Sequence, residues 1–186
     1  MKVTQTVIPE VLVIEPDVFG DSRGFFMETW HHQKYIDAGL NVNFVQDNQS
    51  RSKKGTLRGL HYQLEQPQGK LVRVTSGTVF DVCVDIRVGS PTFSKWVGVE
   101  LNADDHKQLY VPPGFAHGFC VLSESADFLY KCTDYYAPED EHGILWNDPD
   151  IGIRWPGDDF HVSDKDSQNS LLRDINAVLP VYENNG

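Results

Sequence analysis

The alternation of apolar and polar residues along the chain predicts a protein built mainly from short β-strands. It is clearest over residues 80–86, where every second residue is apolar and Asp81, Cys83 and Asp85 stand between them. A period of two places successive side chains on opposite faces, so this strand is expected to have two different faces. Further apolar runs of strand length occupy residues 11–14, 25–30, 42–46, 71–75, 96–101, 108–111, 118–122 and 128–133.

Turn residues separate these runs, for example at Ser76-Gly77 and at Pro112-Pro113-Gly114. Many short strands in close succession are typical of sandwiches, jelly rolls and barrels, so we predict an all-β fold of this kind. Helical patterns are few, with candidates at residues 31–38 and 167–175. Without a repeat, linker or low-complexity tract, the 186 residues are predicted to form a single domain over 1–186, frayed at 183–186.

A short strand predicted at residues 57–63 carries the first residues with clear chemical potential. The sequence there reads Leu-Arg-Gly-Leu-His-Tyr-Gln. The imidazole of His61 can accept and return a proton near neutral pH, and the guanidinium of Arg58 is suited to phosphate. Strand alternation places His61 on one face and Arg58 on the other. For both side chains to reach one ligand, the strand has to bend near Gly59.

Charge and cysteine content narrow the range of partners and compartments. The chain has 16 basic and 27 acidic residues and a net charge of −11, which disfavours nucleic acid and anionic membrane surfaces. Its three cysteines lack the spacing of a disulfide framework or a zinc site. The N-terminus does not resemble a signal peptide, and no apolar run approaches the roughly 20 residues of a membrane span. We therefore expect a soluble, cytoplasmic protein that binds neither nucleic acid nor membranes.

Lys70, His117 and Tyr130 extend the chemistry of His61. Each alone has an ordinary explanation, such as a solvated lysine or a packed tyrosine. Together with His61 they supply a base, a cation for a developing oxyanion, a second polarising group and a weak acid. This combination suits removal of a proton beside a carbonyl, where an enolate has to be stabilised and reprotonated. A carboxylate such as Asp166 could orient the imidazole of His61.

A metal site is the main alternative interpretation, because jelly rolls often hold a metal through a His-x-His pair, a glutamate and a distant histidine. His61, Glu65 and His117 could supply part of such a set. The position of the second histidine in the pair is occupied by Gln63. We therefore predict a site without a metal. A nicotinamide is not expected either, since the chain lacks a Gly-x-Gly-x-x-Gly turn.

The motifs that carry these residues resemble the dTDP-4-dehydrorhamnose 3,5-epimerase family, essentially from end to end and in the same order. The matching stretches are Val-Phe-Gly-Asp-Ser-Arg-Gly-Phe-Phe at 18–26, Phe-Val-Gln-Asp-Asn at 44–48, Leu-Arg-Gly-Leu-His-Tyr-Gln at 57–63, Gly-Lys-Leu-Val-Arg at 69–73, Pro-Gly-Phe-Ala-His-Gly-Phe at 113–119 and Gly-Ile-Leu-Trp-Asn-Asp-Pro at 143–149. The resemblance implies a metal-independent, cupin-like jelly roll that forms a homodimer by exchanging strands. It also implies conversion of dTDP-4-dehydro-6-deoxy-D-glucose to dTDP-4-dehydro-L-rhamnose, in dTDP-L-rhamnose biosynthesis.

The resemblance also implies roles for individual residues. His61 would be the base, Asp166 its partner and Tyr130 the acid on the opposite face of the sugar. Lys70 and His117 would lie near the sugar and its C4 carbonyl, which makes the protons at both C3 and C5 acidic through one enolate. The nucleotide and sugar would be held by Arg23, Glu28, Gln46, Asp47, Asn48, Arg58, Tyr136, Glu141 and Lys165.

Several other functions are compatible with the same residues. A relative that inverts only C3 or only C5, or that shifts the ketone, would use the same base. Retention of both His61 and Tyr130 favours the double epimerase. From other classes, a metal-dependent cupin oxygenase and a catalytically silent sugar-nucleotide-binding module also have to be considered.

Overall fold

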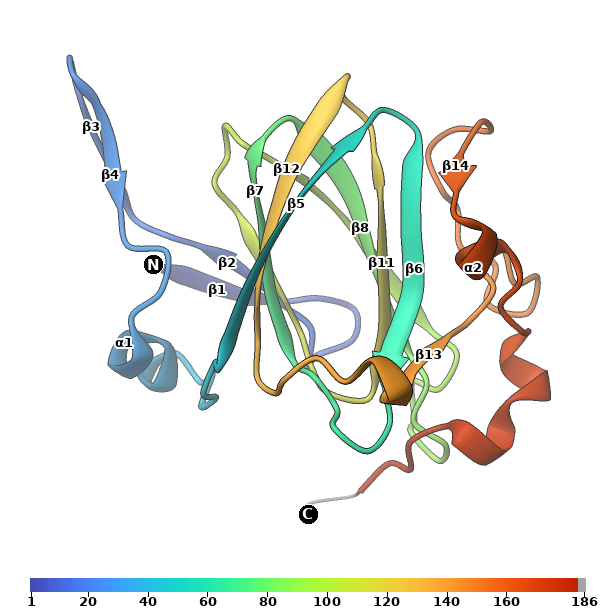
Figure 1. The fold of residues 1–186 in the computed structure, drawn as a ribbon. Coiled ribbons are helices and arrows are strands. Elements are labelled where there is room, and N and C mark those ends of the chain that lie inside the picture. Colours follow the sequence, from blue (N-terminus) through green and yellow to red (C-terminus); the bar gives the residue numbers. More distant parts are fainter. Residues whose placement is uncertain (184–186) are drawn as a thin grey trace.

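The computed structural model describes residues 1–183, and it is built mainly from strands with a few short helices (Figure 1). The strands are β1 (Lys2–Gln5), β2 (Leu12–Glu15), β3 (Val18–Asp21), β4 (Gly24–Met27), β5 (Gln46–Lys53), β6 (Thr56–Gln63), β7 (Lys70–Ser76), β8 (Thr78–Asp85), β9 (Trp96–Asn102), β10 (Gln108–Val111), β11 (Phe115–Val121), β12 (Ser125–Cys132), β13 (Glu141–Gly143) and β14 (His161–Val162). The helices are α1 (His32–Asp37), α2 (Asp164–Ser167) and the 3₁₀ turns η1 (Pro138–Asp140), η2 (Leu172–Asp174) and η3 (Asn176–Val178).

Two antiparallel sheets face each other and form a jelly-roll sandwich, which confirms the predicted fold class (Figure 1). One sheet has the strand order β1-β2-β10-β7-β12-β5, and the other has the order β13-β6-β11-β8-β9. The short β14 adds to β6 in parallel. Strands β3 and β4 pair only with each other and extend from the body as a separate hairpin (Figure 1).

Apolar side chains pack in three groups, one between the sheets and one on the outer face of each. The inner group contains Val72, Leu109 and Phe128. Residues after β13, such as Ile144 and Leu172, cover the outer face of the β6-β11-β8 sheet. Helix α1 and the residues next to it cover part of the outer face of the other sheet. Each sheet therefore has one face toward the interior and one toward a covering segment, which explains why the strands are so largely apolar.

The strand with the clearest alternation, β8, has an unexpected orientation. Its strictly apolar side packs outward, where Val82 and Val84 contact the C-terminal covering segment. Its other side faces the interior and carries Asp81 and Cys83, both fully buried. Polar chemistry is therefore placed inside the sandwich.

The three cysteines are buried within the sheets and form no disulfide. Burial raises the pKa of Cys83 and of Cys132, and it raises the pKa of Cys120 to about 11. All three thiols are therefore protonated and shielded at neutral pH.

Two predicted elements are placed wrongly by the sequence pattern. The apolar run at 42–46 is not a strand, because β5 begins at Gln46 and continues through eight mostly polar residues to Lys53. The helix predicted at 167–175 is wrong as well, since α2 ends at Ser167 and only a 3₁₀ turn, η2, follows. The helix predicted at 31–38 is confirmed by α1. Strands β1, β3, β13 and β14 were not predicted. The fraying expected at residues 183–186 concerns mostly residues outside the described range.

Among residues 1–183, no helix is long and apolar enough to cross a membrane.

Candidate active site

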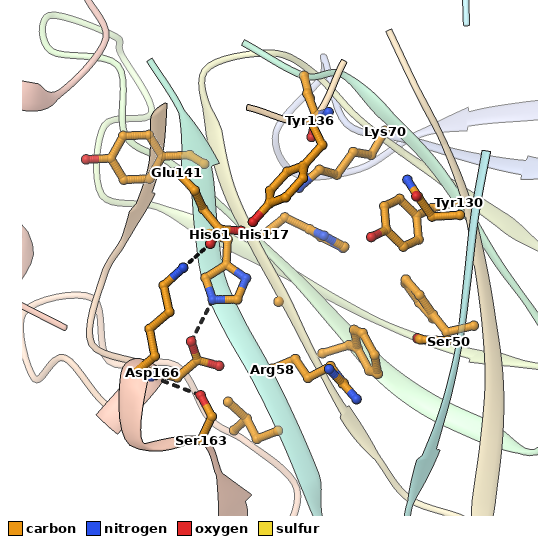
Figure 2. A pocket seen from close by; sticks show the side chains of 18 of the residues that line it. Ser50, Arg58, His61, Lys70, His117, Tyr130, Tyr136, Glu141, Ser163 and Asp166 are labelled. Carbon is orange, nitrogen blue, oxygen red and sulfur yellow. Dashed lines mark hydrogen bonds and ion pairs between the residues drawn. The ribbon is translucent and has the colours of Figure 1, made fainter. Parts of the chain in front are cut away.

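A cavity of about 600 Å³ opens between the two sheets, over most of the length of β6 (Figure 2). It brings together most of the residues that the sequence singled out. These are Gln46, Asn48, Arg58, His61, Lys70, His117, Tyr130, Tyr136, Glu141, Lys165 and Asp166.

His61 and Asp166 form a hydrogen-bonded pair on one side of the cavity (Figure 2). Nε2 of His61 lies 2.7 Å from Oδ1 of Asp166, and the carboxylate also accepts from the backbone N–H of Gly59 at 3.2 Å. Burial opposes ionisation of Asp166, but these hydrogen bonds outweigh it and hold the pKa of the carboxyl below its usual value. A carboxylate that accepts from Nε2–H leaves Nδ1 as the unprotonated nitrogen of a neutral His61.

The bend expected near Gly59 is present and explains how Arg58 joins His61. Strand β6 pairs with β11 so that His117 lies opposite His61 and Phe119 opposite Arg58, which requires one extra residue on β6. Gly59 has a φ of +106°, in a region where residues with a side chain are strained. The bulge reverses the alternation, so that the side chains of His61 and Arg58 line the same cavity.

A second imidazole–carboxylate pair lies deeper in the sandwich. Nε2 of His117 is 2.9 Å from Oδ1 of Asp81, and both side chains are buried. Burial raises the pKa of Asp81, although the contact with His117 opposes this. Asp81 was not singled out by the sequence analysis. The only available signal was an aspartate on the inward side of an otherwise apolar strand.

Tyr130 and Lys70 approach the cavity from the sheet opposite His61 (Figure 2). Tyr130 lies on β12, where burial raises the pKa of its hydroxyl. Lys70 begins β7, next to β12, and burial lowers the pKa of its ammonium group. No carboxylate among the described residues lies within ion-pair distance of Lys70. Its charge is therefore available to an anionic group in the cavity.

The end of the cavity near β13 carries an ion pair and a half-exposed ring. Lys165 on α2 pairs with Glu141 on β13, and this contact raises the pKa of the lysine. Tyr136 is about half exposed, and its backbone N–H donates to Oε1 of Gln46 at 2.9 Å. Gln46 in turn donates to Oδ1 of Asn48. Such a rim of amides, charges and an aromatic face can bind a nucleoside.

Three of the residues predicted to bind substrate lie elsewhere in this chain. Arg23 is at the tip of the β3–β4 hairpin, 88% exposed and paired with Asp21. Glu28 follows the hairpin and pairs with Lys34 of α1. Asp47 points to the outer face of β5, where it pairs with Lys131 and borders a smaller cavity.

The cavity is also lined by residues that the sequence analysis did not assign to it. These are Ser50, Thr56, Leu57, Tyr62, Gln63, Gln68, Gly118, Phe119, Phe128, His161 and Ser163. Most are small, amide or apolar side chains of the same strands, and no local pattern distinguishes them from ordinary strand residues.

The side chain of Gln63 is held by hydrogen bonds to the backbone. Its amide donates to the carbonyl oxygens of Gln66 and Tyr135, and its carbonyl oxygen accepts from the N–H of Ala137. Within residues 1–183, no group of three His, Cys, Asp or Glu side chains could hold a metal ion.

The jelly roll and its cavity define an enzyme that transfers protons, with an imidazole on one sheet facing a phenol and an ammonium group on the other. A family model described as dTDP-4-dehydrorhamnose 3,5-epimerase matches residues 5–174. The chain therefore belongs to the dTDP-4-dehydrorhamnose 3,5-epimerase family, and it is an isomerase.

Individual relatives agree with this assignment. The chain is 58% identical to a dTDP-4-dehydrorhamnose 3,5-epimerase of Shigella flexneri, over 96% of this chain and 100% of the relative. It is similar to the crystal structure of a dTDP-6-deoxy-D-glucose-3,5-epimerase from Legionella pneumophila in complex with dTDP-4-keto-L-rhamnose, with a TM-score of 0.95, 54% identity and 98% coverage of both chains. A 3′-monoepimerase from Streptomyces bikiniensis, in complex with dTDP-quinovose, is more distant, with a TM-score of 0.88, 34% identity, and 96% and 92% coverage.

Proposed function

We propose that this protein converts dTDP-4-dehydro-6-deoxy-D-glucose to dTDP-4-dehydro-L-rhamnose by inverting C3 and C5. The observation that carries the proposal is the opposition of His61, paired with Asp166, and Tyr130 across one cavity. Inversion at carbon requires removal of a proton from one face and its return on the other. Two groups on opposite sheets are suited to this task.

In the proposed mechanism, Nδ1 of neutral His61 takes the proton from C5 or C3. The electron pair of that C–H bond moves toward the C4 oxygen and forms an enolate. The ammonium group of Lys70 and the imidazole of His117 stabilise the developing charge. Tyr130 then donates its hydroxyl proton to the opposite face of the carbon. His61 returns its proton to solvent and Tyr130 regains one, so each inversion is balanced.

Asp166 and Asp81 are proposed to act through their imidazole partners. The Asp166 carboxylate holds the His61 ring in one orientation and favours the imidazolium that forms when the proton is taken. Asp81 similarly orients His117. Neither carboxylate has to contact the substrate.

The nucleotide is proposed to occupy the β13 end of the cavity and to extend toward Arg58. Tyr136 offers a half-exposed ring to thymine, and Gln46 and Asn48 offer amides. Arg58, whose Nε donates to Oγ of Ser52 at 3.1 Å, and Lys165 are the proposed phosphate ligands. Glu141 would release part of its contact with Lys165 when the diphosphate binds. Asp47 stays a predicted substrate-binding residue, although it does not line this cavity.

We also propose a homodimer in which the β3–β4 hairpins are exchanged. The hairpin extends from the body and exposes large apolar side chains, with Phe19 at 64% and Phe26 at 66% exposure (Figure 1). Among the described residues, β5 pairs on one side only, so its other edge offers unpaired backbone groups. A partner hairpin on this edge would cover both features. It would also bring the partner's copies of the exposed Arg23 and Glu28 toward the cavity.

A cytoplasmic location and a single domain over 1–186 belong to the same proposal. Three buried thiols without a disulfide fit a reducing compartment. The segments before β3 and after β13 both pack on the two sheets, so they contribute to one structural unit.

Proton NMR in deuterated water tests the reaction directly. With the dTDP-4-keto-6-deoxy sugar as substrate, we expect deuterium at both C3 and C5 and formation of the L-rhamno product. Deuterium at C3 alone would instead assign the activity of a 3-monoepimerase, as in the more distant relative. No exchange at either carbon, with dTDP still bound, would indicate a silent binding module.

A further inference from the structure

Two connections cross between the sheets at the same end of the sandwich (Figure 1). The first connection, residues 64–69, runs from β6, which carries His61, to β7, which begins with Lys70. The second connection, residues 133–140, runs from β12 to β13 and contains Tyr136. The strands that carry the proposed base and cation are therefore joined by one connection, and the residue proposed to contact thymine lies on the other.

Asp140 joins the two connections. Its side chain is only 9% exposed, and it accepts from three consecutive backbone N–H groups of the first connection. Oδ1 accepts from Leu64 at 3.2 Å and from Glu65 at 3.0 Å, and Oδ2 accepts from Gln66 at 2.8 Å. Burial opposes ionisation of Asp140, but these hydrogen bonds outweigh it and hold the pKa of the carboxyl below its usual value. The bonds are therefore charge-assisted, which makes them roughly twice as strong as neutral ones.

Amide side chains hold the earlier part of the second connection. Nε2 of Gln68 donates to the carbonyl oxygen of Asp134 at 2.9 Å. The amide of Gln63 donates to the carbonyl oxygen of Tyr135 and accepts from the N–H of Ala137. Asp140 supplies the corresponding contact at the end that leads into β13. The backbone of the second connection is thus held at both ends by the first connection and by the end of β6.

The ring of Tyr136 depends on this backbone for its place. It lines the cavity but is 49% exposed (Figure 2), so packing against other side chains fixes it only in part. Asp140 follows four residues later and does not itself line the cavity. Any effect of Asp140 on a ligand therefore has to pass through the residues of the second connection.

We propose that Asp140 is a positioning residue that holds the second connection, and with it Tyr136, in the conformation that binds the nucleotide. This inference rests on the proposed function and gives a role to a buried carboxylate that the mechanism does not use. Without the carboxylate, three N–H groups of the first connection lose their acceptor, and the two connections are no longer tied together. The nucleotide then binds only the fraction of molecules in which the second connection is ordered, so its apparent affinity falls by that fraction.

Binding of dTDP, measured by calorimetry with the full-length protein, tests the proposal. We expect Asp140→Ala to raise the dissociation constant about tenfold, which corresponds to an ordered second connection in about one molecule in ten. KM for the sugar nucleotide should rise in proportion. Turnover at saturation should stay near that of the unsubstituted protein, because bound substrate restores the order. A fall in turnover with an unchanged KM would overturn the proposal.

Glu139→Ala is the matched control. Glu139 lies on the same 3₁₀ turn, η1, and is exposed. The substitution removes the same charge, so it should leave the affinity for dTDP unchanged. An equal loss of affinity in Glu139→Ala and Asp140→Ala would assign the effect to net charge and would overturn the proposal.

A double substitution separates positioning from a purely structural role. If Asp140 acts through Tyr136, the protein with both Tyr136→Ala and Asp140→Ala should bind dTDP no more weakly than Tyr136→Ala alone. Independent losses that multiply would overturn the proposal. Asp140→Asn keeps the volume of the side chain and one acceptor oxygen, so it should give an intermediate affinity and serves if Asp140→Ala does not fold. An unchanged affinity in the variant that folds would also count against the proposal.

Failure of this inference differs from failure of the proposed function. If the unsubstituted protein places deuterium at C3 and C5 and Asp140→Ala binds dTDP as tightly, only the role of Asp140 is wrong. If the unsubstituted protein neither binds dTDP nor catalyses exchange, the proposed function is wrong and the inference falls with it.

Discussion

The contact between Asp166 and His61 gives the cavity its defined imidazole tautomer. Replacing Asp166 by Asn keeps the size of the side chain but removes the charge that favours the imidazolium. We expect turnover of Asp166→Asn to fall by about a hundredfold or more, with little change in KM, because the substrate is bound by other residues. Steady-state kinetics followed by NMR at C5 measure both quantities.

Asp164→Asn is the matched control for this substitution. It lies on the same short helix but is exposed, so its turnover should stay near that of the unsubstituted protein. The two variants should also differ in acid. The folded-state pKa of Asp166 is lowered, so its ionisation contributes stability that is present above the unfolded pKa of about 3.9 and lost as pH falls through the folded pKa. Asp166→Asn should lose less stability on acidification than Asp164→Asn.

Tyr130 is assigned to the second half of each inversion. Tyr130→Phe removes the hydroxyl and leaves the ring in place, so His61 can still take a proton. The same imidazole can then return deuterium to the face it came from. We expect exchange at C3 or C5 with retained configuration and a large loss of epimerised product, both visible in one NMR experiment. Epimerisation at the native rate would exclude Tyr130 as the acid.

Gln63 occupies the place of a second metal-binding histidine, and its amide is instead committed to the backbone of two neighbouring loops. The proposed mechanism requires no Lewis acid, because Lys70 supplies positive charge. We therefore expect activity to survive exhaustive treatment with EDTA. Loss of turnover that is restored by a single divalent ion would contradict this.

The residues that carry chemistry could be predicted individually from the sequence, but their partners could not all be found. His61, Lys70, His117 and Tyr130 stand out because imidazole, ammonium and phenol groups are unusual inside apolar strands. Asp81 was missed because its role depends on a contact with β11, 36 residues away. A pairing of this kind is visible only once the register of the sheet is known.

At the level of single elements, the bulge in β6 determines which side chains share the cavity. A Cβ atom on Gly59 would lie 2.6 Å from the carbonyl oxygen of His117 and 2.7 Å from Cα of Gly118, and φ there is positive. We expect Gly59→Ala to lower the free energy of unfolding by about 3 kcal/mol and to abolish most activity. Urea denaturation measures the first effect.

Gly89→Ala separates the two causes of that loss. Gly89 also has a positive φ, of +88°, but nothing lies within 4 Å of its added Cβ. Its cost should be limited to the backbone strain of about 1–2 kcal/mol. If Gly59→Ala costs no more than Gly89→Ala, close approach of β11 does not define the bulge.

The elements that sequence patterns misplace are those in which tertiary pairing overrides local preference. Strand β5 consists of polar residues from Gln46 to Lys53, because one face lines the cavity and the other carries charges. Hydropathy therefore does not mark it as a strand. The helix predicted at 167–175 is interrupted because Ser170 pairs with Ile144, and that contact cannot be inferred from the periodicity of the segment.

On the scale of the whole molecule, the exposed hairpin suggests that each active site contains residues from two chains. Arg23 at its tip is 88% exposed and does not line the cavity of its own chain. We expect His61→Ala and Arg23→Ala to be inactive separately. Mixing them under conditions of subunit exchange should restore activity, because a heterodimer places both lesions in one site and neither in the other.

Subunit exchange has to be shown independently, by native mass spectrometry of the mixed sample. A mixture of His61→Ala with Asp166→Asn provides the control. His61 and Asp166 of one chain belong to the same active site. Each site of a heterodimer would therefore carry one of the two lesions, and no activity should return. Equal behaviour of the two mixtures, with exchange shown, would mean that each site is built from a single chain.

The three cysteines have a practical consequence. Each is buried in a sheet, and its thiol is kept protonated by its surroundings, so alkylating dyes should not label the native protein. A cysteine introduced at an exposed position of the hairpin would then be its single reactive handle. A fluorophore attached there would report on hairpin movement and subunit association in real time, without removal of any native thiol.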